Sequence, residues 1–247
     1  MDRMIYLAMS GANQITRAQT VNANNLANVS TQGFRADLEA VQARPVYGTG
    51  YASRAYSETY QSGVDLSAGT LMSTGRELDI ALSDKGYLAV TGPDGREAYT
   101  RAGNLRITAN GQLVTANGYA VLGNGGPIAV PPSEKIDIGV DGTITVKGTG
   151  QSAAALSVVD RLRLVSPDPK LLGKSEHGLL VLPENSAVPS ADAGVRVSSG
   201  MLETSNVNAV GSMMRMIELA RQFEMNVKLM QTAQQNDTAT AQLLRMT

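Results

Sequence analysis

The chain has 247 residues, of which 43% are hydrophobic, and its 21 basic and 22 acidic side chains give a formal net charge of -1. This apolar content excludes a wholly disordered chain, and the balanced charge excludes a general binding surface for nucleic acid or for anionic membranes. The absence of cysteine excludes disulfides, thiolate metal sites and cysteine nucleophiles.

No segment approaches the roughly 20 apolar residues that a transmembrane helix needs, so we expect no direct membrane insertion. The first nine residues are apolar, but an acid stands at position 2, no basic run precedes the apolar stretch, and polar Ser10 and Asn13 follow closely. A cleaved signal peptide has a different pattern, and we therefore expect none.

The first predicted element is a helix over residues 4–28, because apolar and amide side chains recur there at intervals of three and four. Arg17 is the only charged residue between Met4 and Phe34, and the remaining polar positions carry neutral side chains, many of them amides. Because asparagine is a mediocre helix former in water, we expect partners to satisfy these amides. The interface candidates in this segment are Ile5, Ala8, Ala12, Ile15, Asn22, Asn25, Leu26 and Asn28.

A stop signal follows this helix at residues 30–33, where Gly33 can adopt the left-handed conformation found after helices. Gly33 and the adjacent Phe34 complete the N-terminal set of interface candidates. The first predicted region therefore comprises residues 1–33. Residues 34–70 are rich in Tyr, Ser, Gly and Thr but poor in bulky aliphatic side chains. We expect them to form an extended connector.

Short alternating runs dominate residues 71–200, and strong turn dipeptides separate them. The dipeptides are Asp94-Gly95, Asn110-Gly111, Asn117-Gly118 and Asp141-Gly142. Such dipeptides between alternating runs are typical of hairpins, so the sequence predicts an antiparallel β domain here.

The last region, residues 201–247, contains a long helical pattern behind a capping region. The capping region supplies the interface candidates Ser205, Asn206, Val207 and Asn208. The heptad-like seam supplies Met213, Met216, Ala220, Phe223, Val227 and Met230. Four-three spacing indicates a helix partner, for which the N-terminal stripe of the same chain is our first candidate.

The fold class that follows is α+β, with N- and C-terminal helices forming a coiled-coil-like pair around an inserted, mainly antiparallel β domain. A stripe at each extreme of the chain favours a building block of a larger assembly. Two other classes remain as alternatives, a monomeric binding module built on the β domain and a hydrolase that uses carboxylates of that domain.

Catalytic, cofactor-binding and metal-binding residues are not predicted. His177 is the single histidine, which cannot complete a common zinc site without further ligands. The glycine-rich pieces have neither P-loop nor dinucleotide spacing, and no nucleophile elbow is present. Carboxylates such as Asp79 and Asp84 are the only basis for hydrolytic chemistry, and turns commonly carry such pairs on the surface.

Two terminal motifs carry a family resemblance. NNLANVSTQGFR (residues 24–35), together with LETSNVN (202–208) and MIELARQFE (216–224), closely resembles the N- and C-terminal signatures of the bacterial flagellar axial family of rod and hook proteins. LDIAL (78–82) and YTRAGN (99–104) are similar to the β domain of that family. The opening residues 1–12 most resemble the proximal-rod class, whereas the length and the short C-terminal tail leave the distal-rod class as an alternative.

The resemblance implies a self-assembling structural subunit of a tubular rod in the flagellar basal body, which spans the periplasm. It implies that the paired terminal helices form the inner wall and that the β domain lies outside. The implied partners are copies of the chain, other rod proteins and the flagellar type III export apparatus, through which the chain passes unfolded.

Overall fold

The structure, a computed structural model, describes residues 4–45, 55–83, 85–148, 156–184 and 186–245, and these fall into two units. The first unit draws on Met1–Ala27, Asp37–Asp65 and Asn208–Thr247, and the second on Asn28–Ala36 and Leu66–Val207. Both units are therefore discontinuous in sequence, and the chain passes between them four times.

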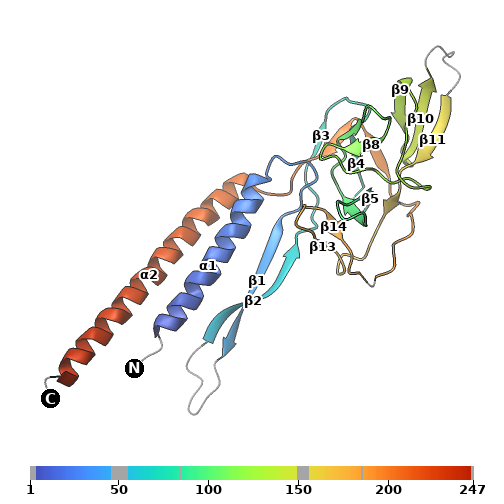
Figure 1. The fold of residues 1–247 in the computed structure, drawn as a ribbon. Helices are drawn as coiled ribbons and strands as arrows, with labels where there is room; N and C mark the ends of the chain where they lie inside the picture. The colour runs from blue at the N-terminus through green and yellow to red at the C-terminus, as the bar shows by residue number, and fades with distance from the viewer. Residues whose placement is uncertain (1–3, 46–54, 84, 149–155, 185, 246–247) are drawn as a thin grey trace. The chain divides into compact units, whose positions relative to one another are not determined.

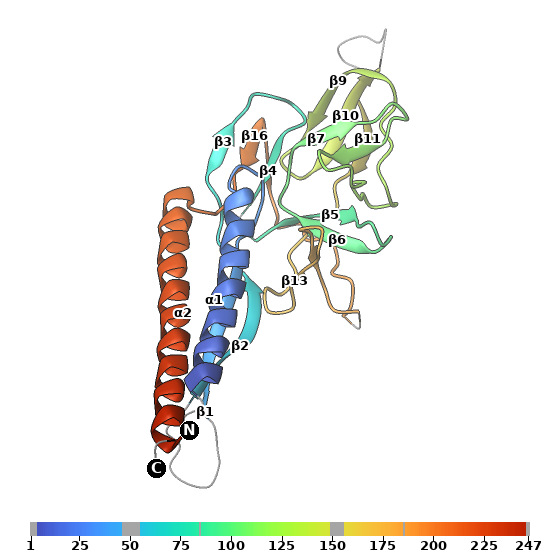
Figure 2. The ribbon, with the colours of Figure 1, turned by 60° about the vertical axis from the view of Figure 1, so that its left-hand side comes forward.

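Two long helices form the first unit together with one hairpin. Helix α1 (Met4–Ala27) and helix α2 (Ala209–Arg245) run antiparallel and side by side, as Figures 1 and 2 show. This pairing, with antiparallel sheets in the intervening sequence, confirms the predicted α+β fold. Neither helix of the described chain is long and apolar enough to cross a bilayer.

A hairpin of β1 (Asp37–Pro45) and β2 (Ala55–Val64) lies along α1. It occupies most of the region that we expected to be an extended connector, of which residues 46–54 lie outside the described chain. Alternating Tyr, Thr and Ser side chains suit a strand as well as an extended segment, so composition alone does not separate the two. Polar contacts with α1 hold the hairpin, including Gln14 Nε2 to Glu39 Oε1 (2.8 Å) and Ser10 Oγ to Ser57 O (3.2 Å).

The ends of the helices follow the predicted signals. Asn208 caps α2, because its Oδ1 accepts a hydrogen bond of 3.0 Å from the Gly211 N–H. After α1, the chain turns through Asn28–Thr31 and reaches Gly33, whose φ of 66° lies in the left-handed region.

The second unit consists of short strands. They are β3 (Leu71–Ser73), β4 (Ile80–Leu82), β5 (Tyr87–Thr91), β6 (Glu97–Thr100), β7 (Leu105–Ile107), β8 (Leu113–Thr115), β9 (Ser133–Ile138), β10 (Thr143–Gly148), β11 (Leu156–Arg161), β12 (Leu164–Val165), β13 (Gly173–Lys174), β14 (Leu180–Val181), β15 (Val197–Ser199) and β16 (Met201–Glu203). The largest sheet has the order β12-β5-β6-β14-β13, and a second has the order β11-β10-β9. Two-stranded pairs β16-β3, β15-β4 and β7-β8 complete the unit.

All strand pairs of the described chain are antiparallel. The glycines of the four predicted turn dipeptides all have φ between 76° and 89°, as tight turns require. Pairing of β3 with β16 sets Leu71 opposite Glu203 and so joins the beginning of the β region to its end. The core beneath these strands is aliphatic, with Ile80, Leu88 and Leu105 among its fully buried members.

Candidate assembly interface

Small and amide side chains of α1 pack against α2. Ala8 and Ala12 are buried, and Asn22 Nδ2 donates a hydrogen bond of 2.8 Å to the Ser212 carbonyl of α2. A Cβ on Gly11 would lie only 2.9 Å from Asn226 Oδ1, so the helices approach closely at this point. The predicted stripe of α1 therefore faces the other terminal helix of the same chain.

The buried face of α2 differs from the predicted seam. Leu219 and Ala233 are each 7% exposed, whereas Phe223 is 38% exposed and Met213 and Met216 are also exposed. Phe223 nevertheless lies only about 40° around the helix from Leu219, and Val227 and Met230 are half-buried. The predicted seam therefore lies at the edge of the buried face, and its contact with α1 stays a prediction. The true face also includes polar Ser212 and Asn226, which a search for apolar heptads does not count.

Apolar side chains remain exposed around much of α2. A monomeric helix normally buries such side chains in one stripe against its own core, but these occupy several sides of the helix. They are Val210, Met213, Met214, Met216, Ile217, Phe223, Met225 and Leu229.

Both candidate amides of α1 find partners within the chain. Besides Asn22, Asn25 exchanges two hydrogen bonds with Asp37, from Nδ2 to the carbonyl (2.9 Å) and from the Asp37 N–H to Oδ1 (2.8 Å). These bonds attach the start of β1 to the last turns of α1. The first unit therefore satisfies part of its amide surface before any neighbour arrives.

The two terminal signatures meet inside the second unit. The Gly33 N–H donates to the Glu203 carbonyl (2.8 Å), and the Asn206 N–H donates to the Phe34 carbonyl (3.3 Å). Asn206 Oδ1 accepts from the Ala36 N–H (2.8 Å). A Cβ on Gly33 would lie 2.3 Å from the Arg101 carbonyl carbon, so only glycine fits there.

Charged side chains of the two signatures form a buried ion cluster, which we define as Arg35, Glu203 and Arg101. Arg35 Nη2 lies 2.7 Å and Arg101 Nη1 3.6 Å from the Glu203 carboxylate, and all three side chains are at most 2% exposed. The Gly69 N–H adds a hydrogen bond of 2.8 Å to this carboxylate. The cluster thus links the N-terminal signature, the C-terminal signature and the β sheet motif 99–104.

Backbone carbonyls accept hydrogen bonds from both guanidinium groups of the ion cluster. Arg101 Nη1 donates to the carbonyls of Leu82 (3.1 Å) and Ser83 (2.7 Å), and Arg35 Nη1 donates to the Ser67 carbonyl. Such partners are needed because a guanidinium group that is buried away from water costs free energy unless its N–H groups are hydrogen-bonded.

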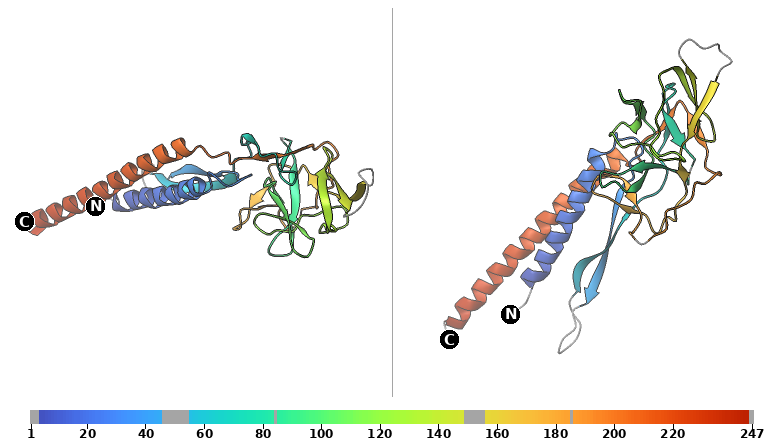
Figure 3. Two further views of the ribbon diagram at one scale, coloured as in Figure 1. Left: turned by 90° about the horizontal axis from the view of Figure 1, so that it is seen from above. Right: turned by 45° about the vertical axis from the view of Figure 1, so that its right-hand side comes forward.

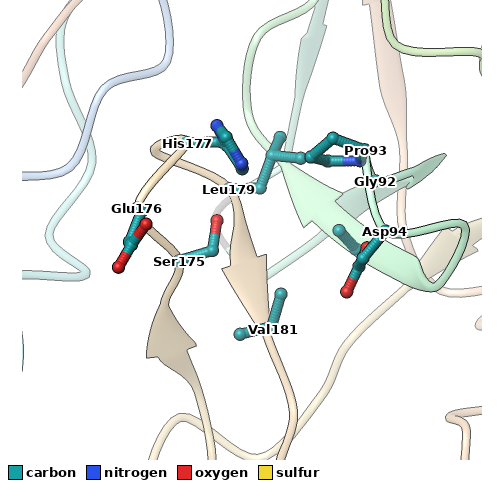
Figure 4. A pocket seen from close by; sticks show the side chains of 9 residues that line it. Gly92, Pro93, Asp94, Ser175, Glu176, His177, Leu179 and Val181 are labelled. Carbon is teal, nitrogen blue, oxygen red and sulfur yellow. The ribbon is translucent and has the colours of Figure 1, made fainter.

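The single histidine lines an open pocket of about 410 Å³ between the β5–β6 and β13–β14 turns. Figure 4 shows His177 and Glu176 on one turn and Asp94 on the opposite side of the pocket, so the two carboxylates do not converge. Of the other carboxylates considered, Asp79 is buried beside Arg76, and Asp84 lies outside the described residues. The described part of the chain holds no group of three or more possible metal ligands.

Sequence reasoning missed the ion cluster and the buried face of α2. A signal for the cluster existed, because Arg35 and Glu203 are rare charges within segments that are otherwise neutral. Their pairing across 168 positions of sequence was not predictable without the fold.

Family models match three separate parts of the chain. Residues 5–35 match "Flagella basal body rod protein", residues 81–146 match "Flagellar hook protein FlgE/F/G D1 domain", and residues 198–243 match "Flagellar basal body rod FlgEFG protein C-terminal". The two terminal matches contain the signature segments described above and nearly all of both helices.

Proteins that are similar to this chain over its full length are also flagellar basal-body rod proteins. The chain is 42% identical over 251 residues to the flagellar basal-body rod protein FlgF of Salmonella typhimurium and to that of Escherichia coli, with 100% of each chain covered. It is 30% identical to FlgG of Buchnera aphidicola subsp. Schizaphis graminum, over 94% of this chain and 95% of that one. With its terminal helices, its signatures and full-length identity in agreement, this chain belongs to the family of the flagellar basal-body rod protein FlgF.

Proposed function

We propose that this chain is a structural subunit of the proximal part of the flagellar rod and assembles with copies of itself and with other rod proteins through its terminal helices. The higher identity to FlgF proteins (42%) than to FlgG proteins (30%) supports the proximal position over the distal one. We also propose that the chain reaches the rod unfolded, through the flagellar type III export apparatus and without a cleaved signal peptide.

Exposed apolar surface on α2 carries this proposal. Large apolar side chains that point away from α1 cost free energy in water, at about 25 cal/mol for each Å² that stays uncovered. Contacts with neighbouring subunits would remove that cost, as interfaces of permanent assemblies do. A monomeric binding module has no need of this surface.

The candidate residues divide into three groups under this proposal. The first group stabilises the helix pair from α1 and consists of Ile5, Ala8, Ala12, Ile15 and Asn22. The second group contacts neighbouring subunits and includes exposed Met213 and Ala220 of α2, whereas Met216 and Phe223 lie at the edge of the buried face. The third group is the signature residues, of which segments 28–34 and 205–207 contact each other within the β unit and Asn208 caps α2.

Ile217→Asp tests the proposal. Ile217 is 57% exposed and lies on the opposite side of α2 from Leu219, so the aspartate would be solvated in the monomer but buried without a partner between subunits. We expect normal thermal unfolding of the monomer together with loss of rod incorporation and of motility. Ile217→Leu keeps an apolar contact and should support motility. Normal swimming of the Ile217→Asp strain would contradict the assembly role of this face.

A further inference from the structure

One side of α1 carries exposed side chains at helical spacing. We call it the open face of α1, and it consists of Tyr6, Met9, Asn13 and Arg17. They border a groove of about 430 Å³ whose opposite wall is residues 56–58 of β2. Arg17 is the only charged residue of α1, and it forms no ion pair with the residues that the structure describes.

A matching face lies on α2. Met214, Glu218, Met225 and Leu229 share one side of that helix, and we call them the outer face of α2. All four are exposed, and the Glu218 carboxylate accepts only a local hydrogen bond of 3.2 Å from Gln222 Nε2 among the bonds described. Glu224 lies about 120° around the helix from Glu218 and belongs to another side.

The spacing of charge and apolar residues agrees between the two faces. Tyr6 precedes Arg17 by eleven residues, and Leu229 follows Glu218 by eleven, which is about 16 Å along either helix. If the helices run antiparallel with Arg17 beside Glu218, Tyr6 meets Leu229 and Met9 meets Met225. Copies that point in one direction present α1 and α2 antiparallel to each other, as they are within one chain (Figure 3).

We propose that the open face of α1 on one copy packs against the outer face of α2 on a neighbouring copy, in the register that pairs Arg17 with Glu218. The proposal rests on assembly through the terminal helices and specifies the partner, a second copy of this chain, and the contact. Charged residues at the edges of helix pairs set register in this way. A slip of one turn toward the C-terminus of α2 would place Arg17 beside Arg221, and repulsion of like charges disfavours that register.

Cysteine cross-linking tests the register, because the natural chain has no cysteine. Met9→Cys and Met225→Cys are placed on separate chains, and the two proteins are mixed at a concentration where the wild type self-associates. Under mild oxidation we expect disulfide-linked dimers in the mixture and only background dimers in either protein alone. Efficient dimers of Met9→Cys with itself, or no dimers in the associated mixture, would overturn the register.

Charge reversal tests the ion pair. Arg17→Glu and Glu218→Arg each bring like charges together, and we expect each to raise the concentration needed for self-association about tenfold. The double variant restores an opposite pair and should return within about twofold of the wild type. Glu184→Arg is the matched control, because Glu184 is an exposed acid of the β unit outside both faces, and this variant should behave like the wild type.

The outcomes separate this inference from the function on which it rests. Thermal unfolding of each variant first shows that the monomer is intact, as expected for exposed positions. If the wild type associates and Ile217→Asp disrupts this association while the charge reversals do not, assembly stands and the Arg17–Glu218 register fails. If the concentrated wild type never associates with itself, the self-assembly part of the proposed function fails as well.

Discussion

Glu203 holds two guanidinium groups in the interior of the β unit. Its carboxylate lies 2.7 Å from Arg35 Nη2 and accepts a backbone hydrogen bond from Gly69. Few carboxylates are buried so fully, because desolvation of each charge costs several kcal/mol unless partners surround it. Here the partners come from both terminal signatures, so the ion cluster makes the β unit depend on segments far apart in sequence.

We predict that Glu203→Gln destabilises the β unit by about 3 kcal/mol, because it removes the buried carboxylate that lies 2.7 Å from the Arg35 guanidinium. Urea unfolding followed by near-ultraviolet circular dichroism of the tyrosines measures this change. The matched control is Glu184→Gln, which breaks an exposed ion pair with Arg96 (2.6 Å) and should cost less than about 1 kcal/mol. Equal effects of the two substitutions would refute the structural importance of the cluster.

Tyr99 makes the β unit sensitive to alkali. Burial, followed by the nearby Glu97 carboxylate, raises the pKa of the Tyr99 phenol well above its ordinary value of 10.0. Above pH 10 the unfolded chain loses this proton while the folded chain keeps it, so stability falls as pH rises. We expect Tyr99→Phe to flatten the decline of the unfolding free energy between pH 10 and pH 11, measured against Tyr119→Phe as the control.

At the scale of elements, α2 serves two roles on different sides. Its 37 residues exceed the 24 of α1, so part of α2 extends past the start of α1 (Figure 3). Leu219 and Ala233 pack within the chain, while the apolar residues on other sides are exposed. Apolar residues of α2 are therefore spread over several sides of the helix and are not confined to a single stripe.

Leu219→Asp and Ile217→Asp should therefore fail at different stages. We predict that Leu219→Asp destabilises the helix pair by about 3 kcal/mol, because it buries an unpaired charge against α1. Thermal loss of helical circular dichroism at 222 nm in dilute protein measures it. Ile217→Asp should leave this transition within about 1 kcal/mol of the wild type, and similar transitions for both variants would show that the two sides are not distinct.

At the scale of the whole molecule, the two units differ in how they are stabilised. The β unit has an aliphatic core and a buried ion cluster, whereas the helix unit buries few large apolar side chains and exposes many. Regions with few buried apolar contacts open at lower free energy than well-packed cores. We therefore expect the helix unit of the monomer to open before the β unit.

Limited proteolysis of dilute monomer tests this difference. We predict that cleavage within the helices precedes cleavage of the β unit, and that the resistant product retains both Arg35 and Glu203. Mass spectrometry identifies the fragment ends. Intact helices in a protein that stays monomeric would contradict coupling between assembly and order.

Sequence patterns alone were sufficient for the class of fold. Neutral helical stripes at both ends and glycine turn dipeptides in the middle predicted the helix pair and the antiparallel sheets, because these signals are local and depend on backbone geometry. Asn208 as the cap of α2 and Gly33 after α1 were predictable for the same reason. The signature segments also predicted the family correctly.

Tertiary structure decided which residues meet. Leu219, which the predicted seam omits, lies on the buried face of α2. Close approach at Gly11 and polar pairs such as Asn22 with Ser212 set the rotation of α2, and apolar periodicity does not record them. The ion cluster joins Arg35, Arg101 and Glu203 only when the sheet brings three distant segments together. Local periodicity specifies elements, whereas long-range packing selects the side of each element that is buried and so the side that is free for assembly.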